Sequence, residues 1–321
     1  MEQTRINLGD FGAKMDEVKS EISRVIVGNK EQVDLLLTAI LAGGHVLLEG
    51  VPGTAKTLLA RLVSRLIDAG FSRVQFTPDL MPSDVLGTTV FNMKSGEFDF
   101  HPGPVFADIV LVDEVNRAPA KTQAALFEVM EERQVTIDGT THPMSDIYTI
   151  IATQNPVEQE GTYKLPEAQL DRFLMKIVMG YPEESEEIQI LERHQNNSRL
   201  VKLEEVTPVV SRSELLQLRA MLQDVVVDPS LMKFIVDICQ QTRKSRAVYL
   251  GASPRAAVAM LQSAKAFALL QGRDFITPDD VKCVTPAILQ HRLILTADAE
   301  MEGYTPEKVA RRLLDKVEVP K

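Results

Sequence analysis

The stretch His45–Thr57, HVLLEGVPGTAKT, follows the order of a buried strand, a tight loop and the start of a helix. The apolar run at 46–48 predicts a short parallel strand, and the apolar spacing after Thr57 predicts a helix. The loop between them consists of Gly50, Val51, Pro52, Gly53, Thr54 and Ala55. Such a loop turns backbone N–H groups toward an anion at the positive end of the helix. The stretch therefore predicts a phosphate-binding loop.

Two side chains directly after this loop indicate how it would hold a nucleotide. Lys56 can reach the β- and γ-phosphates, and the hydroxyl group of Thr57 can bind Mg²⁺. The common pattern has glycine before the lysine, whereas this chain has Ala55. Its methyl group can restrict the backbone dihedrals or the approach to phosphate. The alternative interpretation is an ordinary Gly-Pro turn between a strand and a helix.

The composition is that of a globular protein with an acidic surface. The 321 residues are 45% hydrophobic and 25% charged, with a formal net charge of -10. This charge disfavours nucleic acid and anionic membranes as partners, outside a local basic patch. Cys239 and Cys283 lie in apolar helical contexts, which predicts core residues and no zinc cluster or disulfide. A charged N-terminus and the lack of a long apolar run predict a cytoplasmic protein without a membrane span.

Alternating strand and helix patterns predict an α/β domain with a parallel five-stranded sheet covered on both faces. The expected strands are 46–48, 73–77, 109–112, 148–153 and 173–179. The expected helices of this domain are 8–22, 33–41, 58–68 and 120–132. Two β-hairpins, 88–101 within an insert at about 84–103 and 134–143, interrupt the alternation.

After residue 182 the sequence carries helical periodicity without a strong strand pattern. The expected helices are 183–197, 213–223, 229–244, 254–271, 278–290 and 305–317. A serine or threonine followed by proline, as at Ser253 and Thr277, is a typical helix start. We therefore expect two domains, an α/β domain over 1–182 and a small helical domain over 183–321.

Polar residues follow two of the predicted strands. Asp113 and Glu114 end the third strand, at the sheet edge where open α/β sheets bind ligands. Asp113 would complete the Mg²⁺ shell and Glu114 would orient or deprotonate the attacking water, unless the two form an ordinary surface pair. Asn155, after the fourth strand, can donate to the γ-phosphate. It can equally be a turn residue before Pro156.

Two arginines outside this edge have two interpretations each. Arg172, directly before the fifth strand, can pair with Asp171 or another local carboxylate, as most arginines do. It can instead reach the γ-phosphate of a neighbouring subunit as an arginine finger. Arg255 starts a helix of the second domain and can touch bound phosphate, which would couple the nucleotide state to the domain angle. A structural role is the alternative for both.

Together these motifs resemble the AAA+ ATPases, and specifically the MoxR family. The resemblance covers about residues 25–300, and Ala55 is usual in that family. It rests on the segments 50–57, 113–119, 121–123, 130–134, 152–156, 167–173 and 251–255.

The resemblance implies a role for each candidate residue. Lys56 and Thr57 correspond to Walker A, and Asp113 and Glu114 to Walker B. Further correspondences are Asn155 to sensor 1, Arg172 to the arginine finger, Arg255 to sensor 2, and Val27 and Gly28 to the linker turn packed on adenine. The hairpin at 88–101 resembles the helix-2 insert and that at 134–143 the pre-sensor-1 hairpin. The role of Arg117 stays open.

The resemblance also implies a function, namely an ATP- and Mg²⁺-dependent ATPase that forms a homo-oligomeric ring, a hexamer in the family. MoxR relatives act as chaperone-like machines on protein partners, often with von Willebrand factor A domains, in some cases for metal insertion. One alternative is a nucleic-acid motor, but the first hairpin is not basic, with Lys94, Glu97, Asp99 and His101. Another is a nucleotide-binding scaffold with little turnover, which the intact Glu114 and Arg172 disfavour.

Overall fold

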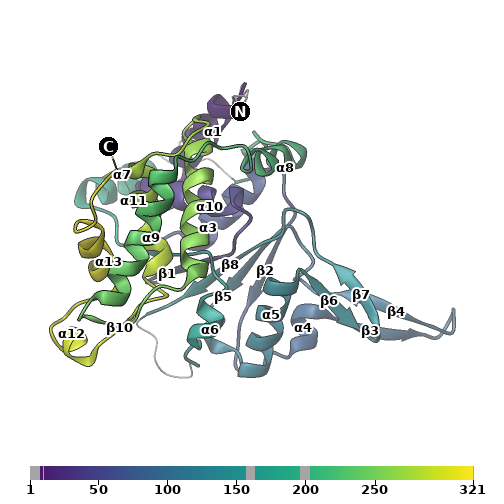
Figure 1. Cartoon of the computed structure of the whole chain (residues 1–321). Helices are drawn as coiled ribbons and strands as arrows, with labels where there is room; N and C mark the ends of the chain where they lie inside the picture. Colours follow the sequence, from purple (N-terminus) through teal and green to yellow (C-terminus); the bar gives the residue numbers. More distant parts are fainter. Residues whose placement is uncertain (1–7, 10, 157–162, 196–202, 321) are drawn as a thin grey trace.

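The computed structural model describes residues 8–9, 11–156, 163–195 and 203–320, and its centre is a five-stranded sheet (Figure 1). The strand order is β2-β5-β8-β1-β9, and all four pairings are parallel. The strands are β1 Val46–Gly50, β2 Phe71–Gln75, β5 Ile109–Asp113, β8 Thr149–Gln154 and β9 Met175–Met179. The predicted parallel α/β sheet is confirmed, although β2 lies two residues earlier than predicted.

Side chains on the two faces of this sheet belong to different hydrophobic clusters, because successive residues of a strand point to opposite faces. Val46, Leu48 and Leu111 pack with helices α1 Phe11–Val25, α2 Lys30–Leu41 and α3 Lys56–Leu66. Leu47 and Val110 pack on the other face, with helix α5 Ala120–Glu132. Apolar residues at both alternating positions thus bury the central strands on two sides.

Two β-hairpins project from the α5 side of the sheet, away from the C-terminal helices (Figure 1). Strands β3 Gly87–Asn92 and β4 Glu97–Pro102 form the first, after the short helix α4 Pro82–Leu86. The second consists of β6 Gln134–Ile137 and β7 Thr140–Pro143. The rings of Phe100 and His142 stack with centroids 4.2 Å apart, so the hairpins contact each other. Both lie where the sequence pattern predicts them.

The C-terminal part is mainly helical, as predicted. Its longer helices are α7 Glu184–Gln195, α8 Arg212–Met221, α9 Pro229–Lys244, α10 Pro254–Leu270, α11 Pro278–Leu289 and α13 Pro306–Leu314. Residues 196 and 197 of the first predicted segment lie outside the described residues. Helix α12 Ala297–Met301 and the two-stranded sheet of β10 Val248–Leu250 and β11 Ile294–Leu295 were not predicted. Strands of three and two residues are too short to show an alternating pattern.

The C-terminal helices pack directly on the first part of the chain. Helix α10 runs along α2, and α11 contacts β9. Gln290 donates to the Lys176 carbonyl at 2.6 Å, and Arg219 donates to the Ile40 carbonyl at 2.7 Å. One continuous apolar cluster includes residues of both parts. Among the described helices, none combines the length and apolar character that crossing a bilayer requires.

Candidate functional site

The loop between β1 and α3 is held open around the start of the helix. Gly53 has φ +88°, and Ala55 adopts the left-handed conformation with φ 58° directly before the first residue of α3. A Cβ atom at Gly50 would lie 2.6 Å from the carbonyl oxygen of Met179, so glycine is required where β1 passes β9. The predicted strand–loop–helix arrangement is therefore present, and Ala55 occupies a backbone conformation that glycine favours.

Lys56 points back into this loop. Its Nζ atom donates to the carbonyl oxygens of Gly50 at 2.8 Å and Val51 at 2.7 Å, and to Thr54 Oγ1 at 3.2 Å. Burial lowers the pKa of Lys56, and the charge of Asp113 opposes this shift. The ammonium group thus lies beside the helix N-terminus and within the electrostatic reach of a carboxylate.

A hollow of about 400 Å³ opens in front of the loop and collects most predicted residues of the sheet edge. Its lining includes Lys56, Thr57, Asp113, Glu114 and Asn155. Among the loop residues, Val51 alone is outside the lining, and it contributes its carbonyl group to Lys56. Parallel strands β1, β5 and β8 end at the same edge, which explains why residues from distant parts of the sequence meet there.

Both acidic residues are held by neighbouring strands. Arg73 Nε donates to Asp113 at 2.6 Å, and the Thr153 hydroxyl group donates to the other Asp113 oxygen at 3.1 Å. Gln75 Nε2 donates to Glu114 at 2.8 Å, and the Glu114 N–H group donates to Thr153 at 3.0 Å. Glu114 itself has φ 57°, the left-handed region. Such a conformation in a non-glycine residue costs about 1–3 kcal/mol and is typical of functional sites.

Arg117, whose role the sequence leaves open, lies next to Glu114. Its Nη1 atom is 3.1 Å from a Glu114 oxygen. Sequence reasoning also missed Arg73, Gln75 and Thr153 as residues that line the hollow. Gln75 stands opposite Asp113 in the register of β2 and β5. Once that pairing is known, the polar residues at the end of β2 identify Arg73 and Gln75 as neighbours of the acidic pair.

A second hollow, of about 230 Å³, continues from the loop. Val27, Gly53 and Ala55 line it together with Ile190 and His194 of α7, so residues from both parts of the chain enclose it. Gly28 is not part of the lining, but it has φ +74°, and a Cβ atom there would approach the Glu186 carboxylate within 2.5 Å. The predicted turn at Val27 and Gly28 is thus adjacent to the loop and closely packed.

The structure does not bring Arg172 and Arg255 to the first hollow, in front of the 50–57 loop. Because β9 runs parallel to β1, with Met175 opposite Val46 and Met179 opposite Gly50, Arg172 lies at the start of β9 and at the other edge of the sheet. The length of β1 alone separates the two edges by about 13 Å.

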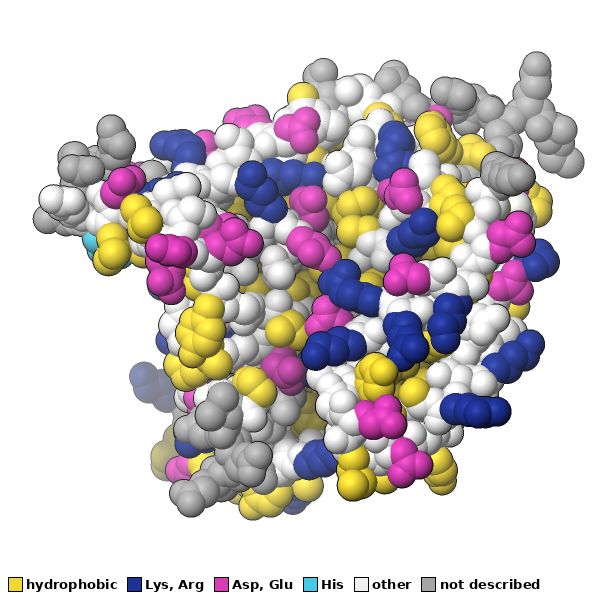
Figure 2. All heavy atoms as spheres, turned by 90° about the vertical axis from the view of Figure 1, so that its left-hand side faces the viewer, with side chains coloured by type: hydrophobic (Ala, Val, Ile, Leu, Met, Phe, Trp, Pro, Cys, Tyr) yellow, Lys and Arg dark blue, Asp and Glu magenta, His cyan; other side chains and the backbone are white. Residues whose placement is uncertain are grey.

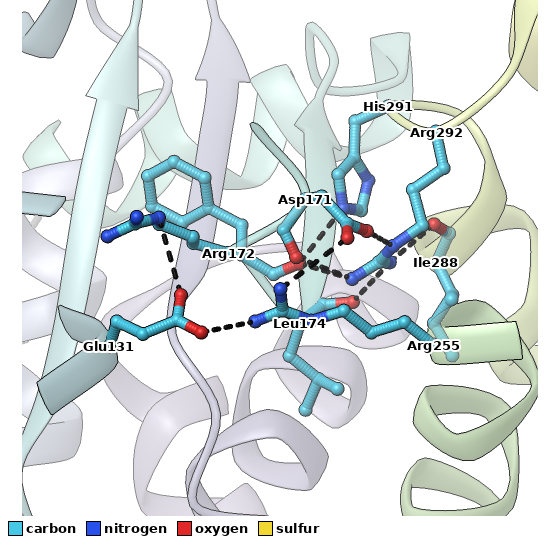
Figure 3. Close-up of polar contacts among 9 residues, drawn as sticks. Glu131, Asp171, Arg172, Leu174, Arg255, Ile288, His291 and Arg292 are labelled. Atoms are coloured by element: carbon cyan, nitrogen blue, oxygen red, sulfur yellow. Dashed lines mark hydrogen bonds and ion pairs between the residues drawn. The ribbon is translucent and has the colours of Figure 1, made fainter. Parts of the chain in front are cut away.

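Both arginines lie near Glu131, as Figure 3 shows. Arg172 Nε is 3.4 Å from one Glu131 oxygen and Arg255 Nη2 is 3.5 Å from the other. Arg172 also donates to the Phe127 carbonyl, and Arg255 lies 3.7 Å from Asp171. Glu131, near the end of α5, and Asp171 therefore hold the guanidinium groups of Arg172 and Arg255 close together.

Arg292, three residues after the end of α11, fixes the backbone between Asp171 and β9 (Figure 3). It donates to the Asp171 carboxylate at 2.6 Å, to the Phe173 carbonyl at 2.7 Å and to the Leu174 carbonyl at 3.1 Å. Its side chain is only 5% exposed. The neighbouring His291 makes a 3.0 Å contact with the same Phe173 carbonyl. A C-terminal helix thus determines the position of the segment that carries Arg172.

The donor set of the first hollow fits a magnesium–nucleotide complex. Among the described residues, no group of three or more His, Cys, Asp or Glu side chains could hold a metal alone. Mg²⁺ usually takes one or two protein oxygens and completes its shell with water and phosphate. The hydroxyl group of Thr57 and the carboxylate of Asp113, which line the same hollow, supply donors of this kind.

Comparison with known proteins agrees with these features. Residues 45–175 match the model of the ATPase family associated with various cellular activities (AAA), and residues 240–313 match the AAA lid domain. Chaperone MoxR1 of Mycobacterium tuberculosis is 44% identical over 309 residues, 94% of this chain and 81% of that protein. Protein MoxR of Methylorubrum extorquens is 31% identical over 316 residues, 92% of this chain and 91% of that protein.

A solved structure has the same fold over nearly the whole length. The crystal structure of a protein assigned as an ATPase from Cytophaga hutchinsonii superposes with a TM-score of 0.88 at 42% identity, and the match covers 97% of this chain and 96% of that one. The phosphate-type loop, the acidic strand end and the helical C-terminal part are common features of AAA ATPases. The chain belongs to the MoxR family of AAA+ ATPases, and its predicted family and fold are confirmed.

Proposed function

We propose that this protein hydrolyses Mg²⁺-bound ATP in the hollow between the 50–57 loop and the end of β5. The observation that carries the proposal is the placement of Lys56 and the N-terminus of α3 on one side of that hollow, with Asp113 and Glu114 among its lining residues. This arrangement offers positive charge to a triphosphate and carboxylates to a metal ion and a water molecule. The second hollow, beside Val27, would take the adenine ring.

Each residue of the hollow then has a defined task. Lys56 and the N–H groups of the loop bind the β- and γ-phosphates. Thr57 and Asp113 hold Mg²⁺, which neutralises charge on the phosphates during transfer. Glu114 orients and deprotonates the attacking water, and its contacts with Gln75 and Arg117 fix its direction. Asn155 donates an amide hydrogen bond to the γ-phosphate or to the water.

Turnover further requires a neighbouring subunit in this proposal. Arg172 lies across the sheet from the hollow and near the exposed end of α5. In this proposal its guanidinium group would therefore serve another copy of the chain. Arg255 shares Glu131 with it and would act at the same neighbouring nucleotide. A homo-oligomeric ring, a hexamer by family resemblance, provides such an arrangement for every subunit.

We further propose that the ring acts on protein partners in a chaperone-like manner, as the name of the M. tuberculosis relative states for that protein. Partners with von Willebrand factor A domains, and metal insertion into some of them, are the family-based expectations. The division of the chain at residue 182 would let hydrolysis move the helical part against the sheet. The first hairpin exposes Phe91, Met93 and Phe98. This apolar surface fits a polypeptide better than nucleic acid.

The test compares two variants at a protein concentration that permits ring formation. Glu114→Gln should bind a fluorescent ATP analogue as tightly as the natural protein and release no phosphate, because only the activation of water is lost. Lys121→Gln, an exposed lysine on α5, is the matched control and should retain turnover. Phosphate release by Glu114→Gln at the natural rate would refute this site. Undetectable turnover of the natural protein in every ring preparation would favour a binding scaffold instead.

A further inference from the structure

A basic hollow of about 330 Å³ lies between helices α9 and α13 on the face of the molecule that carries the C-terminal helices. Figure 2 views this side and shows Lys and Arg side chains gathered near its centre. Three stretches of the chain form the hollow: the end of α9, the loop at 245–247, and residues 304–316, which contain α13. The lining includes Gln241, Lys244, Arg246, Tyr304, Arg312 and Lys316.

The four cations of this basic hollow have no acidic partner within the part of the chain that the structure describes. Among the described residues, none of Lys244, Arg246, Arg312 and Lys316 forms an ion pair, whereas Arg311, next in sequence, pairs with Glu307 at 3.0 Å and Glu31 at 3.6 Å. Arg312 donates only to the Tyr304 hydroxyl group, at 2.8 Å. Acidic residues outnumber basic ones by 45 to 35 in this chain. Four unpaired cations around one hollow therefore oppose the average charge of the surface.

Helix dipoles explain only part of this arrangement. Cations in the last turn of a helix stabilise its carbonyl end, which accounts for Lys244 at the end of α9 and Arg312 near the end of α13. Arg246 lies in the loop after α9, and Lys316 lies beyond the last residue of α13. Mutual repulsion of the four charges in one hollow remains, and a bound carboxylate would relieve it.

Apolar side chains form part of the wall of the hollow and are exposed on neighbouring segments. Val309 and Leu313 of α13 form part of the wall. The loop at 245–247 leads directly into β10, where Tyr249 is 80% exposed. The Ala247 carbonyl accepts a hydrogen bond from the Thr296 N–H group at 3.1 Å, which places the start of α12 beside the hollow. Met301, at the end of α12, is 87% exposed. The surface therefore combines positive charge with exposed apolar groups.

We propose that the basic hollow binds a short acidic segment of a protein partner, with carboxylates at the four cations and apolar side chains against α12 and β10. A short peptide fits because all of its carboxylates can lie within the hollow, and none needs to extend over the acidic surface around it. A long polyanion such as DNA would continue over a surface whose net charge is negative, and repulsion there opposes binding. The site is distinct from the ATP hollow and does not depend on the ATPase proposal.

The test is a fluorescence anisotropy titration of the full chain with a short labelled peptide of alternating glutamate and leucine. We expect binding that weakens with salt. The double variant Arg312→Glu with Lys316→Glu should weaken it by at least about tenfold, since two exposed charge pairs are lost and the reversed charges add repulsion. The neutral pair Arg312→Gln with Lys316→Gln should have a smaller effect in the same direction.

The matched control reverses two exposed lysines near the hairpins, Lys94→Glu with Lys121→Glu, and should leave the peptide affinity within about twofold. The Lys94 and Lys121 variant should keep the thermal unfolding midpoint, because both side chains are exposed. The Arg312 and Lys316 reversal should lower the midpoint by only a few degrees, because it places negative charge at the carbonyl end of α13 without changing a buried side chain. The proposal is wrong if the natural protein does not bind the peptide, or if the Arg312 and Lys316 reversal binds it equally well. It is also wrong if a single-stranded oligonucleotide binds more tightly than the peptide. A reversal that changes only self-association would identify a second copy of the chain as the occupant and overturn the proposal.

Discussion

The two edges of the central sheet carry opposite kinds of charge arrangement. At the carboxyl edge, Lys56 lies with Asp113 and Glu114 around an open hollow. At the amino edge, Arg172 and Arg255 lie against Glu131, and neither of the two hollows described beside the phosphate loop includes them in its lining. One chain therefore holds the groups that would bind a triphosphate in the proposed mechanism, whereas the cations that would stabilise its transition state lie at the other edge. This difference favours a mechanism in which binding is a property of one subunit and turnover a property of the assembly.

The largest effect is expected for Lys56→Ala, at the carboxyl edge. This change removes the ammonium group that contacts two loop carbonyls and would contact two phosphates, so nucleotide binding and turnover should both fall below detection. Isothermal titration with a nonhydrolysable ATP analogue measures the loss. Lys121→Ala, exposed on α5, should bind normally. An affinity of the Lys56 variant within about threefold of that of the natural protein would show that the nucleotide binds elsewhere. The carboxyl edge would then not be the nucleotide-binding edge.

Arg172→Ala should separate nucleotide binding, which we assign to the carboxyl edge, from turnover, which also needs the amino edge. The nucleotide affinity should not change, because Arg172 does not line the hollow, whereas turnover should fall by about 10³-fold, as for arginine fingers in general. Steady-state phosphate release against protein concentration measures both the loss and the need for assembly.

Mixing supplies the control for this prediction. Rings that combine Arg172→Ala with Glu114→Gln contain interfaces in which an intact Arg172 faces an intact Glu114, so part of the activity should return. Neither variant should gain activity when it is mixed with the double variant Arg172→Ala with Glu114→Gln, which supplies neither intact residue. Absence of any recovery would contradict an arginine that acts across subunits, and would return Arg172 to a structural role with Glu131.

Arg292→Met tests how the C-terminal helices position the amino edge. The variant keeps the apolar stem of a side chain that is 5% exposed but loses the bonds to Asp171 and to the Phe173 and Leu174 carbonyls. Loss of this buried cation from its three acceptors should lower the free energy of unfolding by about 3 kcal/mol. Turnover should fall by about tenfold through displacement of Arg172, with unchanged nucleotide affinity. Arg292→Lys, which restores the charge without the planar contacts, should recover stability more than turnover.

Acid should weaken the same edge through two buried histidines. Burial lowers the pKa of His45 to about 3 and lowers that of His291 well below its usual value. His45 accepts from the Ile150 N–H group and lies 3.1 Å from the Met130 carbonyl. Both rings therefore stay neutral in the folded chain and take up a proton on unfolding. Their contribution is complete above the unfolded pKa of about 6.5 and is lost as the pH falls.

Urea unfolding between about pH 7 and pH 5.5 measures this effect. Below about pH 6.5 each histidine should remove about 1.4 kcal/mol of stability for each pH unit. His45→Gln should reduce the pH dependence by about half, since glutamine can also donate and accept but does not titrate. An unfolding free energy that stays constant over this range would show that these rings are not kept neutral by burial.

The sequence predicted the carboxyl edge better than the amino edge for a physical reason. The strand, loop and helix of His45–Thr57 are local, and their residues meet whatever the rest of the chain does. Asp113 and Asn155 could be added because all parallel strands of a sheet end at one edge. Arg73 and Gln75 were missed because their contact with the acidic pair depends on β2 lying next to β5, and strand order is not written in any local pattern.

Contacts between distant segments account for the other omissions. The hydrogen bonds from Arg292 to the Asp171–Leu174 segment join residues about 120 positions apart. No periodic pattern in the sequence indicates such a contact. Strands β10 and β11 are too short for an alternating pattern, and they pair across a helical segment. The assignments of Arg172 and Arg255 stay predictions, as do the roles of the Walker-type residues and the division of the chain at residue 182. For Ala55, in contrast, the structure adds what the sequence could not give: the sequence indicated that its methyl group can restrict the backbone, and the structure shows the left-handed conformation.

Ala55→Gly should have the smallest effect, and its sign is informative. Alanine at φ 58° is strained by about 1–2 kcal/mol relative to glycine, but glycine also raises the entropy of the unfolded chain by about 0.4–1 kcal/mol. The variant should therefore be more stable by up to about 1 kcal/mol in urea unfolding. Gly53→Ala is the matched change of opposite sign, since Gly53 has φ +88° with nothing within 4 Å of an added Cβ atom. Only backbone strain can then destabilise it. If Ala55→Gly lowers stability instead, the left-handed conformation at Ala55 is not held in solution, and the phosphate loop is not the preformed site on which the comparison of the two edges rests.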